Sequence, residues 1–325
     1  MLTLYDTRGQ TPGLARREGC DTILGTTVWL DLLNPTEAED EHVEKALGIS
    51  IPTRAEMREI EASNRFYQEN GAHFMTAFIV YNVDAPIPET STLTFVLAGN
   101  RLVTVRYSEP KAIQLYVARA DKGDAQCSSG ATILTGLIES IISRQADLVE
   151  RIQDETERLA RSVFEIKGGQ QTRSRRLDVL LKTTGKEGDL VSRAQESAFS
   201  MDRLLTYFLA VAKERGDDPR LVERLQTAQR DTASLMEHMR FVSNRLTFLL
   251  DATLGMINIE QNQIIKLFSV VSVVLMPPTL IASIYGMNFK AMPELSWPLG
   301  YPWAIGLMIA SAIVPFLYFR RKGWL

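Results

Sequence analysis

Ten residues near the C-terminus of this 325-residue chain decide its fold: Tyr285-Gly286-Met287-Asn288-Phe289-Lys290-Ala291-Met292-Pro293-Glu294. They lie between two apolar segments that are each long enough to cross a bilayer as a helix. A short polar loop in this place suits an ion entrance, because its backbone and amide oxygens can face a water-filled mouth. It also suits a plain turn in a two-span membrane anchor, and the surrounding sequence must separate the two interpretations.

The two apolar segments are residues 267–287 and 299–319, and neither contains a charged residue. Lys266 precedes the first segment, and a basic tail, Arg320-Arg321-Lys322, follows the second. Positive residues collect on the cytoplasmic side of membrane spans. The sequence therefore predicts that both termini are cytoplasmic, that the loop 288–298 faces outward, and that residues 320–325 form a basic cytoplasmic tail.

The charge of the chain is unevenly distributed. Five of its 36 Lys and Arg residues and one of its 39 Asp and Glu residues lie at or beyond Lys266, which leaves 31 basic and 38 acidic residues before it. This mild acidity argues against nucleic-acid binding, which requires clustered positive charge. Residues 1–10 contain no apolar run typical of a signal peptide. We therefore expect the part before the first span to be cytoplasmic.

A polar seam runs into the first span. Its positions are separated alternately by four and by three residues, and this spacing places them on one face of a helix. They are Asp251, Gly255, Asn258, Asn262, Ile265, Ser269, Ser272, Met276, Thr279 and Ser283. A polar stripe inside a membrane avoids lipid, and several copies packed around an axis would turn it toward a central pore. Tight helix packing through small residues is the alternative.

Two prolines, Pro277 and Pro278, interrupt the first span. They remove two backbone donors and predict a bend or a widening of the helix. Met276 directly precedes them on the seam and could form a flexible apolar constriction.

The part before the spans predicts a mixed α/β domain followed by long helices. Strands are expected at 27–32, 72–82, 92–98 and 101–107, a helix with a capping box at Thr36 and Glu39, and another helix at 111–120. Longer helices are expected at 129–166, at 172–215 with weak points at Gly185 and Gly188, and at 218–284. No phosphate loop, His-Cys cluster or catalytic triad is present, so an enzyme is not expected.

The chain resembles the CorA family of divalent-cation channels. The resemblance rests on Gly286-Met287-Asn288 after a membrane helix, on Met292-Pro293-Glu294-Leu295, and on Ile257-Asn258-Ile259-Glu260-Gln261-Asn262 before the span. Pro277-Pro278-Thr279 and Trp29-Leu30-Asp31-Leu32 are similar to family members too. The resemblance covers the whole chain and is strongest after residue 250.

The resemblance implies a homopentameric funnel in the bacterial inner membrane, with the first membrane helix lining the pore. Gly286, Met287 and Asn288 would form the selectivity filter, in which five Asn288 side chains hold a hydrated Mg²⁺. Residues at the family's pore-lining positions are Asp251, Asn262, Met276, Thr279 and Asn288. Lys266, Arg320, Arg321 and Lys322 would form a basic collar at the inner mouth. The family also implies closure by internal Mg²⁺, through acidic ligands that the resemblance does not place here.

One residue departs from the family pattern. Family members often carry an acid directly after Asn-Phe, where this chain has Lys290, so Glu294 is the only acid in the loop. Attraction of cations to the mouth is correspondingly weaker, and Zn²⁺, Co²⁺ or Ni²⁺ stay open as transported ions.

Together these features predict an α+β membrane protein. Its parts are a cytoplasmic α/β domain (1–125), a helical stalk (126–265), a pore-lining span (266–287), a periplasmic loop (288–298), a second span (299–319) and the basic tail. The expected function is a channel for Mg²⁺, with Co²⁺ or Ni²⁺ as further ions. The alternatives are a Zn²⁺ transporter of the same superfamily, driven by protons or not, and a non-conducting membrane-tethered sensor.

Overall fold

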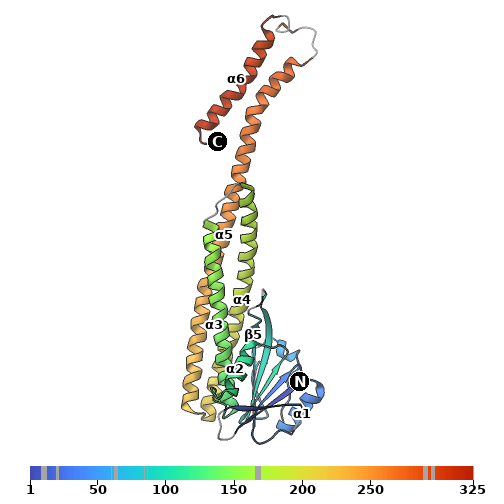
Figure 1. Ribbon diagram of the computed structural model, residues 1–325, viewed down its shortest axis with the longest axis vertical. Coiled ribbons are helices and arrows are strands. Elements are labelled where there is room, and N and C mark those ends of the chain that lie inside the picture. Colours follow the sequence, from blue (N-terminus) through green and yellow to red (C-terminus); the bar gives the residue numbers. More distant parts are fainter. Residues whose placement is uncertain are drawn as a thin grey trace. The chain divides into compact units, whose positions relative to one another are not determined.

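The structure is a computed structural model that describes residues 1–8, 13–19, 22–59, 61, 65–83, 85, 87–164, 170–287, 292–293 and 297–324, with residues 170–175 described by their backbone alone (Figure 1). The chain forms two compact units. Unit 1 comprises Met1–Ser162 and Lys182–Leu249, and unit 2 comprises Val163–Leu181 and Leu250–Leu325.

Unit 1 contains one seven-stranded sheet, with the strands in the order β2-β1-β3-β7-β6-β5-β4. The strands are β1 (Leu2–Thr7), β2 (Leu14–Glu18), β3 (Thr27–Leu33), β4 (Phe66–Glu69), β5 (Ala72–Tyr81), β6 (Glu89–Ala98) and β7 (Arg101–Arg106). The central pair β3–β7 is parallel and the other pairs are antiparallel. A parallel pair requires a long crossover connection. The chain between β3 and β7 contains the helix α1 and the strands β4, β5 and β6.

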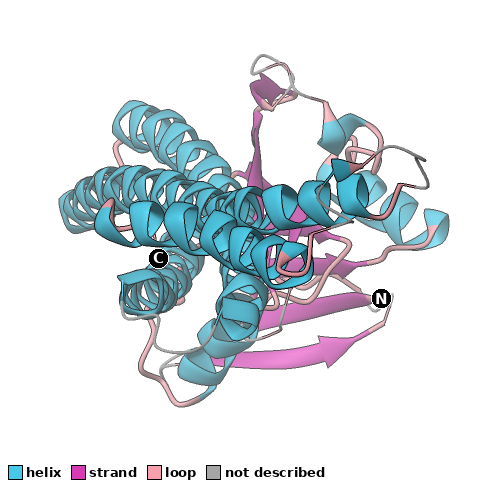
Figure 2. Ribbon diagram, turned by 90° about the horizontal axis from the view of Figure 1, so that it is seen from above, coloured by secondary structure: helices cyan, strands magenta, loops and turns pink. Residues whose placement is uncertain are grey.

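Both faces of the sheet are covered. One face carries Trp29, Met75 and Phe95, which pack in one core with residues of the helices α2 (Lys111–Asp121), α3 (Gly130–Phe164), α4 (Gln170–Arg215) and α5 (Pro219–Tyr285). The other face packs against Val43 of α1 (Glu37–Leu47) and Met57 of the 3-10 helix η1 (Glu56–Arg58). Figures 1 and 2 both show the sheet beside the bundle of long helices.

The long helices of unit 1 are joined by polar contacts along their lengths. Arg224 of α5 donates to both carboxylate oxygens of Glu139 on α3, at 2.9 and 2.7 Å. Gln145 of α3 donates to Ser197 of α4 at 2.7 Å, and Ser197 in turn donates to the backbone carbonyl of Phe78 on β5. The helices are therefore fixed to one another and to the sheet.

Most of the predicted elements are present. The capping box at Thr36 and Glu39 opens α1, and the hairpin of β6 and β7 turns at Gly99-Asn100. The helix expected at 218–284 is the single 67-residue α5, which at 1.5 Å per residue is about 100 Å long. The expected weak points at Gly185 and Gly188 do not interrupt α4, which runs unbroken from Gln170 to Arg215.

Three strands were missed. The strands β2 and β4 form the two edges of the sheet, and β2 (Leu14–Glu18) contains three charged residues and only one fully apolar side chain that is buried. Edge strands tolerate charge because one side of their backbone is unpaired. The strand β1 lies between β2 and β3 and is as long as the predicted strand β7, so its length does not explain why it was missed.

A buried ion pair ties the parallel strands together. Asp31 of β3 is 2% exposed and Arg106 of β7 is 8% exposed. Their side chains form a two-pronged contact, Nε to Oδ1 at 3.0 Å and Nη2 to Oδ2 at 2.8 Å. Thr104 also donates to Asp31 at 2.6 Å, and Trp29 donates to Thr104. Burial and the nearby Asp31 carboxylate raise the pKa of Tyr5 to about 12.

Replacing Asp31 by alanine should destabilise the sheet strongly. The change leaves the Arg106 guanidinium buried without its counter-charge, and breaking a buried pair on one side costs about 3–5 kcal/mol. The measurement is urea denaturation of the full chain in detergent, followed by circular dichroism. The double variant Asp31→Leu with Arg106→Met removes both charges and should recover most of the loss. Equal instability of the single and the double variant would contradict this account.

Candidate ion pathway

Every seam position lies on the exposed surface of the single chain. All ten positions from Asp251 to Ser283 are on the one helix α5, and each is exposed. Two of them are apolar and large: Ile265 is 62% exposed and Met276 is 68% exposed. A row of Asn, Ser and Thr side chains with no cover from its own chain needs water or another molecule against it inside a membrane.

Few residues of α5 after residue 250 are covered by the described part of the chain. Thr253 is 0% exposed and Glu260 is 6% exposed. Each lies two residues along the helix from a seam position, which is about 200° around its axis. Glu260 was not recognised as special in the sequence, and its Oε1 has no hydrogen-bond partner among the described residues. Apolar neighbours of the seam such as Leu267, Phe268 and Leu280 are exposed as well. The polarity of the seam, and not its exposure alone, therefore distinguishes it from the rest of the helix in unit 2.

The helix continues through Pro277 and Pro278. Because proline has no N–H, the carbonyls of Val273 and Val274 lose their usual donors four residues further on. Thr279, the next seam residue, donates its hydroxyl to the carbonyl of Leu275 at 2.8 Å. The segment 273–279 therefore brings backbone carbonyls with incomplete helical bonding close to the seam. The predicted bend of the helix at the prolines stays a prediction.

The filter motif begins where α5 ends. The N–H of Gly286 donates to the carbonyl of Ala282 at 3.0 Å, and the N–H of Met287 donates to that of Ile284 at 3.2 Å. A Cβ atom at residue 286 would lie 3.1 Å from the carbonyl oxygen of Ala282, so glycine fits this closely packed last turn. Asn288, Lys290 and Glu294, on which the filter prediction depends, lie outside the described residues.

The basic residues of the predicted collar are all exposed. Lys266 is on α5, whereas Arg320 and Arg321 end the helix α6 (Gly300–Arg321) and Lys322 caps it. The N–H of Lys322 donates to the carbonyl of Tyr318, and the ring of Trp324 stacks on Phe319 with centroids 5.4 Å apart. Figure 1 shows α6 returning antiparallel to the last part of α5.

Within the part of the chain that the structure describes, two helices, α5 and α6, are long and apolar enough to span a membrane. Only 6% of the apolar window of each is buried inside the chain. A core helix of a soluble protein would be mostly buried, so the lack of cover favours membrane spans.

No group of three or more His, Cys, Asp or Glu side chains that could hold a metal ion occurs in the described part of the single chain. Cys127 is buried, and burial raises the pKa of its thiol. His73 contacts the hydroxyl of Tyr207, and His238 contacts Gln153, as expected for packing residues.

Comparison with known proteins decides the family. Residues 25–321 match the family described as "CorA-like Mg2+ transporter protein". The chain belongs to this family. It is 39% identical to the magnesium transport protein CorA of Yersinia pseudotuberculosis and 37% identical to that of Escherichia coli K12, in each case over 93% of both chains.

The fold agrees with this membership. The structure of the CorA magnesium transporter from Methanocaldococcus jannaschii superposes with a TM-score of 0.76 over 100% of this chain and 99% of that one, at 20% sequence identity. The resemblance read from the loop motif is thereby confirmed, and so is the expectation that the chain is a transporter and not an enzyme.

Proposed function

We propose that this CorA-family chain assembles as a homopentamer in the bacterial inner membrane and conducts Mg²⁺ along the seam of α5. One observation carries the proposal: the seam from Asp251 to Ser283 is a mostly polar face of α5 that is exposed throughout in a single chain and continues into the apolar span. A polar face that a membrane helix leaves open is best satisfied by water around a shared axis.

The proposed arrangement follows the boundaries predicted from the sequence. Residues 1–125 and 126–265 form the cytoplasmic domain and stalk, 266–287 line the pore, and 299–319 pack outside it. Five copies of Asp251, the only charged seam residue, would place a ring of carboxylates on the cytoplasmic part of the pathway. Such a ring attracts cations without binding them in a closed site. Lys266, Arg320, Arg321 and Lys322 form the collar at the inner mouth.

At the outer mouth, Gly286, Met287 and Asn288 form the filter. Mg²⁺ gives up its waters reluctantly, so neutral amide oxygens that contact the hydrated ion avoid the cost of dehydration. Lys290 and Glu294 are the charged residues of the loop. Co²⁺ and Ni²⁺ are the further ions that we expect to pass.

Ion-by-ion flux measures this proposal directly. The purified chain in liposomes, with an ion-sensitive dye inside, should admit Mg²⁺ faster than Zn²⁺, and a pH gradient should not alter the rate. Faster entry of Zn²⁺ that depends on a pH gradient would instead favour the proton-coupled zinc transporter. If the correctly assembled protein conducts none of the divalent ions tested, the non-conducting sensor is favoured.

Internal divalent ions should close the channel by binding between the cytoplasmic parts of neighbouring subunits. The absence of a three-residue metal site within one described chain agrees with ligands shared between copies. Anything that binds one conformation stabilises it.

Millimolar Mg²⁺ should therefore slow tryptic cleavage of the cytoplasmic part in the detergent-solubilised protein. Band intensities over a time course measure the effect, and KCl at matched ionic strength is the control. If the cleavage pattern and rate do not respond to Mg²⁺, gating by internal ions loses its support.

A further inference from the structure

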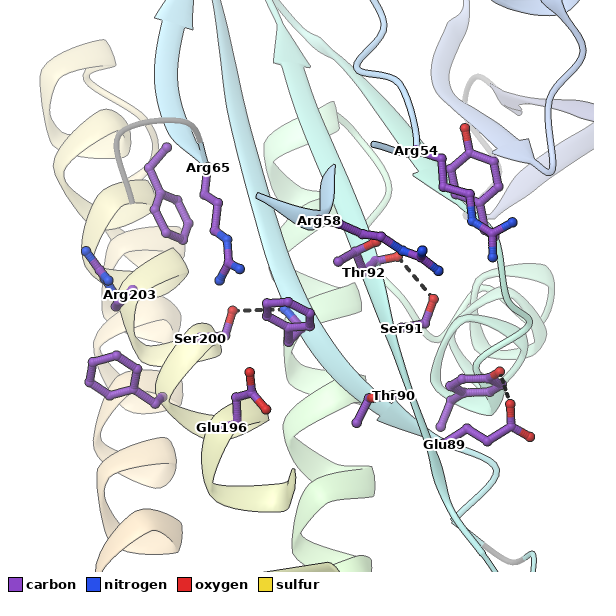
Figure 3. Close-up of a pocket in the computed structure, with 15 residues that line it drawn as sticks. Arg54, Arg58, Arg65, Glu89, Thr90, Ser91, Thr92, Glu196, Ser200 and Arg203 are labelled. Carbon is purple, nitrogen blue, oxygen red and sulfur yellow. Dashed lines mark hydrogen bonds between the residues drawn. The ribbon is translucent and has the colours of Figure 1, made fainter. Parts of the chain in front are cut away.

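A basic cavity of about 770 Å³ lies in unit 1, and none of the seam residues lines it. It is bounded by η1, β5, β6 and α4 (Figure 3). Its lining includes four arginines from separate parts of the chain: Arg54, Arg58, Arg65 and Arg203. Sequence reasoning did not find this cluster, because only folding brings Arg203 into the same cavity as the other three arginines.

The four arginines share the cavity with Glu196, which acts electrostatically on Arg65. Within the described residues, none of them has a carboxylate oxygen within 4.0 Å. The lining contains two acids, Glu196 and Glu89, and the carboxylate of Glu89 accepts a hydrogen bond from Tyr81 at 2.5 Å. The cavity thus has two positive charges in excess. Burial lowers the pKa of Arg65, the carboxylate of Glu196 opposes this shift, and the like charge of Arg203 adds to it.

Aromatic rings hold three of the guanidinium groups. The Cζ of Arg65 lies 4.3 Å from the ring centre of Phe78, that of Arg54 lies 5.1 Å from Tyr107, and that of Arg203 lies 5.8 Å from Phe199. Stacking covers the flat face of a guanidinium and leaves its N–H edge free to donate. Arg65 is fixed further by a bond from its Nε to the carbonyl of Glu59. These arginines are held in place before any ligand arrives.

We propose that this cavity binds a small molecule carrying two or more phosphate groups. Arginine binds phosphate through paired N–H donors, and the volume lies in the range of small-molecule sites. Figure 3 shows Arg65 and Arg203 on the α4 side of the cavity and Arg54 and Arg58 on the opposite side. A ligand with two or more phosphate groups could contact arginines on both sides. Inorganic polyphosphates and nucleotides share this chemistry.

The same chemistry predicts competition with Mg²⁺. The metal binds the phosphate oxygens of such a ligand and neutralises two of its charges. The arginines should therefore prefer the uncomplexed anion. This consequence depends on charge alone, and its test requires no ion flux, so its failure and the failure of the proposed channel function can be told apart.

The experiment is isothermal titration calorimetry of the full-length protein in detergent, in metal-free buffer at low ionic strength. The probes are inorganic phosphate, pyrophosphate, tripolyphosphate, ADP and ATP. Saturable binding of the polyphosphates, but not of inorganic phosphate, is expected. Preference for ATP over tripolyphosphate would identify a nucleotide as the ligand, and equal affinity would identify the polyphosphate chain alone. Saturating Mg²⁺ should weaken each affinity.

The matched variants are Arg58→Gln, Arg203→Gln and Arg240→Gln. Arg58 lines the cavity and makes no other described contact, and Arg240 is an exposed arginine of α5 outside it. Loss of one charge-assisted contact should weaken binding about tenfold or more at Arg58 and Arg203, with no change at Arg240. Arg58→Lys keeps the charge without the paired donors and should give an intermediate affinity.

Three results would overturn the proposal. They are no binding of any polyphosphate by the wild-type protein, affinities that the cavity variants share with wild type, and dissociation of the oligomer in the cavity variants. The last result, seen by size-exclusion chromatography with light scattering, would assign the arginines to an interface between subunits.

Discussion

Asn288→Ala should reduce Mg²⁺ flux at least about tenfold and abolish the preference for Mg²⁺ over other divalent ions. In the proposed pentamer the substitution removes five amide oxygens at once. A hydrogen bond contributes about 0.5–1.5 kcal/mol net, and 1.4 kcal/mol corresponds to a factor of ten. The loss of two or more such contacts to the hydrated ion is therefore enough for a tenfold effect, and alanine supplies no group to replace them.

The measurement is dye-reported flux into liposomes, normalised to the amount of assembled protein. Asn288→Gln keeps an amide but moves it outward by one methylene group, and should fall between wild type and alanine. Gln263→Ala removes an exposed amide from α5 one residue beyond the seam position Asn262, and should leave flux near the wild-type rate. Unchanged flux and unchanged ion preference in Asn288→Ala would contradict the assignment of residue 288 to the selectivity filter.

Much of the fold follows from local sequence signals. The capping box at Thr36 and Glu39, the turn at Gly99-Asn100 and the proline-free run from Pro219 to Pro277 each mark an element through its immediate neighbours in the chain. The seam is equally local, because helical spacing alone places Asp251 and Ser283 on one face. These signals come from residues close together in the sequence and do not depend on tertiary contacts.

Other features depend on parts distant in the sequence. The ion pair of Asp31 with Arg106 joins residues 75 positions apart, and its register follows from the parallel pairing of β3 and β7. The arginine cavity likewise needs α4 to lie against β5, a contact made by Ser197 and Ser200 with the backbone of Phe78. No period or motif in the sequence encodes such pairings, so sequence reasoning did not find them.

The candidate site is divided in the same way. Residues 251–285 lie on a described helix and residues 286–287 follow it directly, whereas Asn288, Lys290 and Glu294 lie outside the described residues. A single chain also does not contain the surface that faces the seam, because in the proposed pentamer that surface belongs to the other subunits. The pore and packing interpretations therefore make the same prediction for a monomer and differ only in how a substitution on the seam affects conduction.

Ser272→Leu should reduce Mg²⁺ flux by about tenfold or more, while Val273→Leu should leave it nearly unchanged. Both side chains are exposed on the single chain, Val273 by 45%, and they are adjacent in sequence. Around a shared axis, however, five leucines at position 272 would form an apolar constriction, and such rings block ions by excluding water. At position 273, about 100° away on the helix, leucine only adds one methylene group to an apolar surface.

The three interpretations of the seam separate in this experiment. A conducting seam predicts an assembled Ser272→Leu protein without flux, and Thr279→Leu should behave in the same way. Tight helix packing predicts instead that Ser272→Leu disrupts the oligomer, because bulk at a close contact between helices forces them apart. A sensor tolerates leucine at 272 and 279 in both assembly and signalling. Flux together with oligomeric state, measured on the same preparations, therefore shows whether the open face of α5 surrounds a water-filled path, because only a pore loses conduction while keeping its assembly.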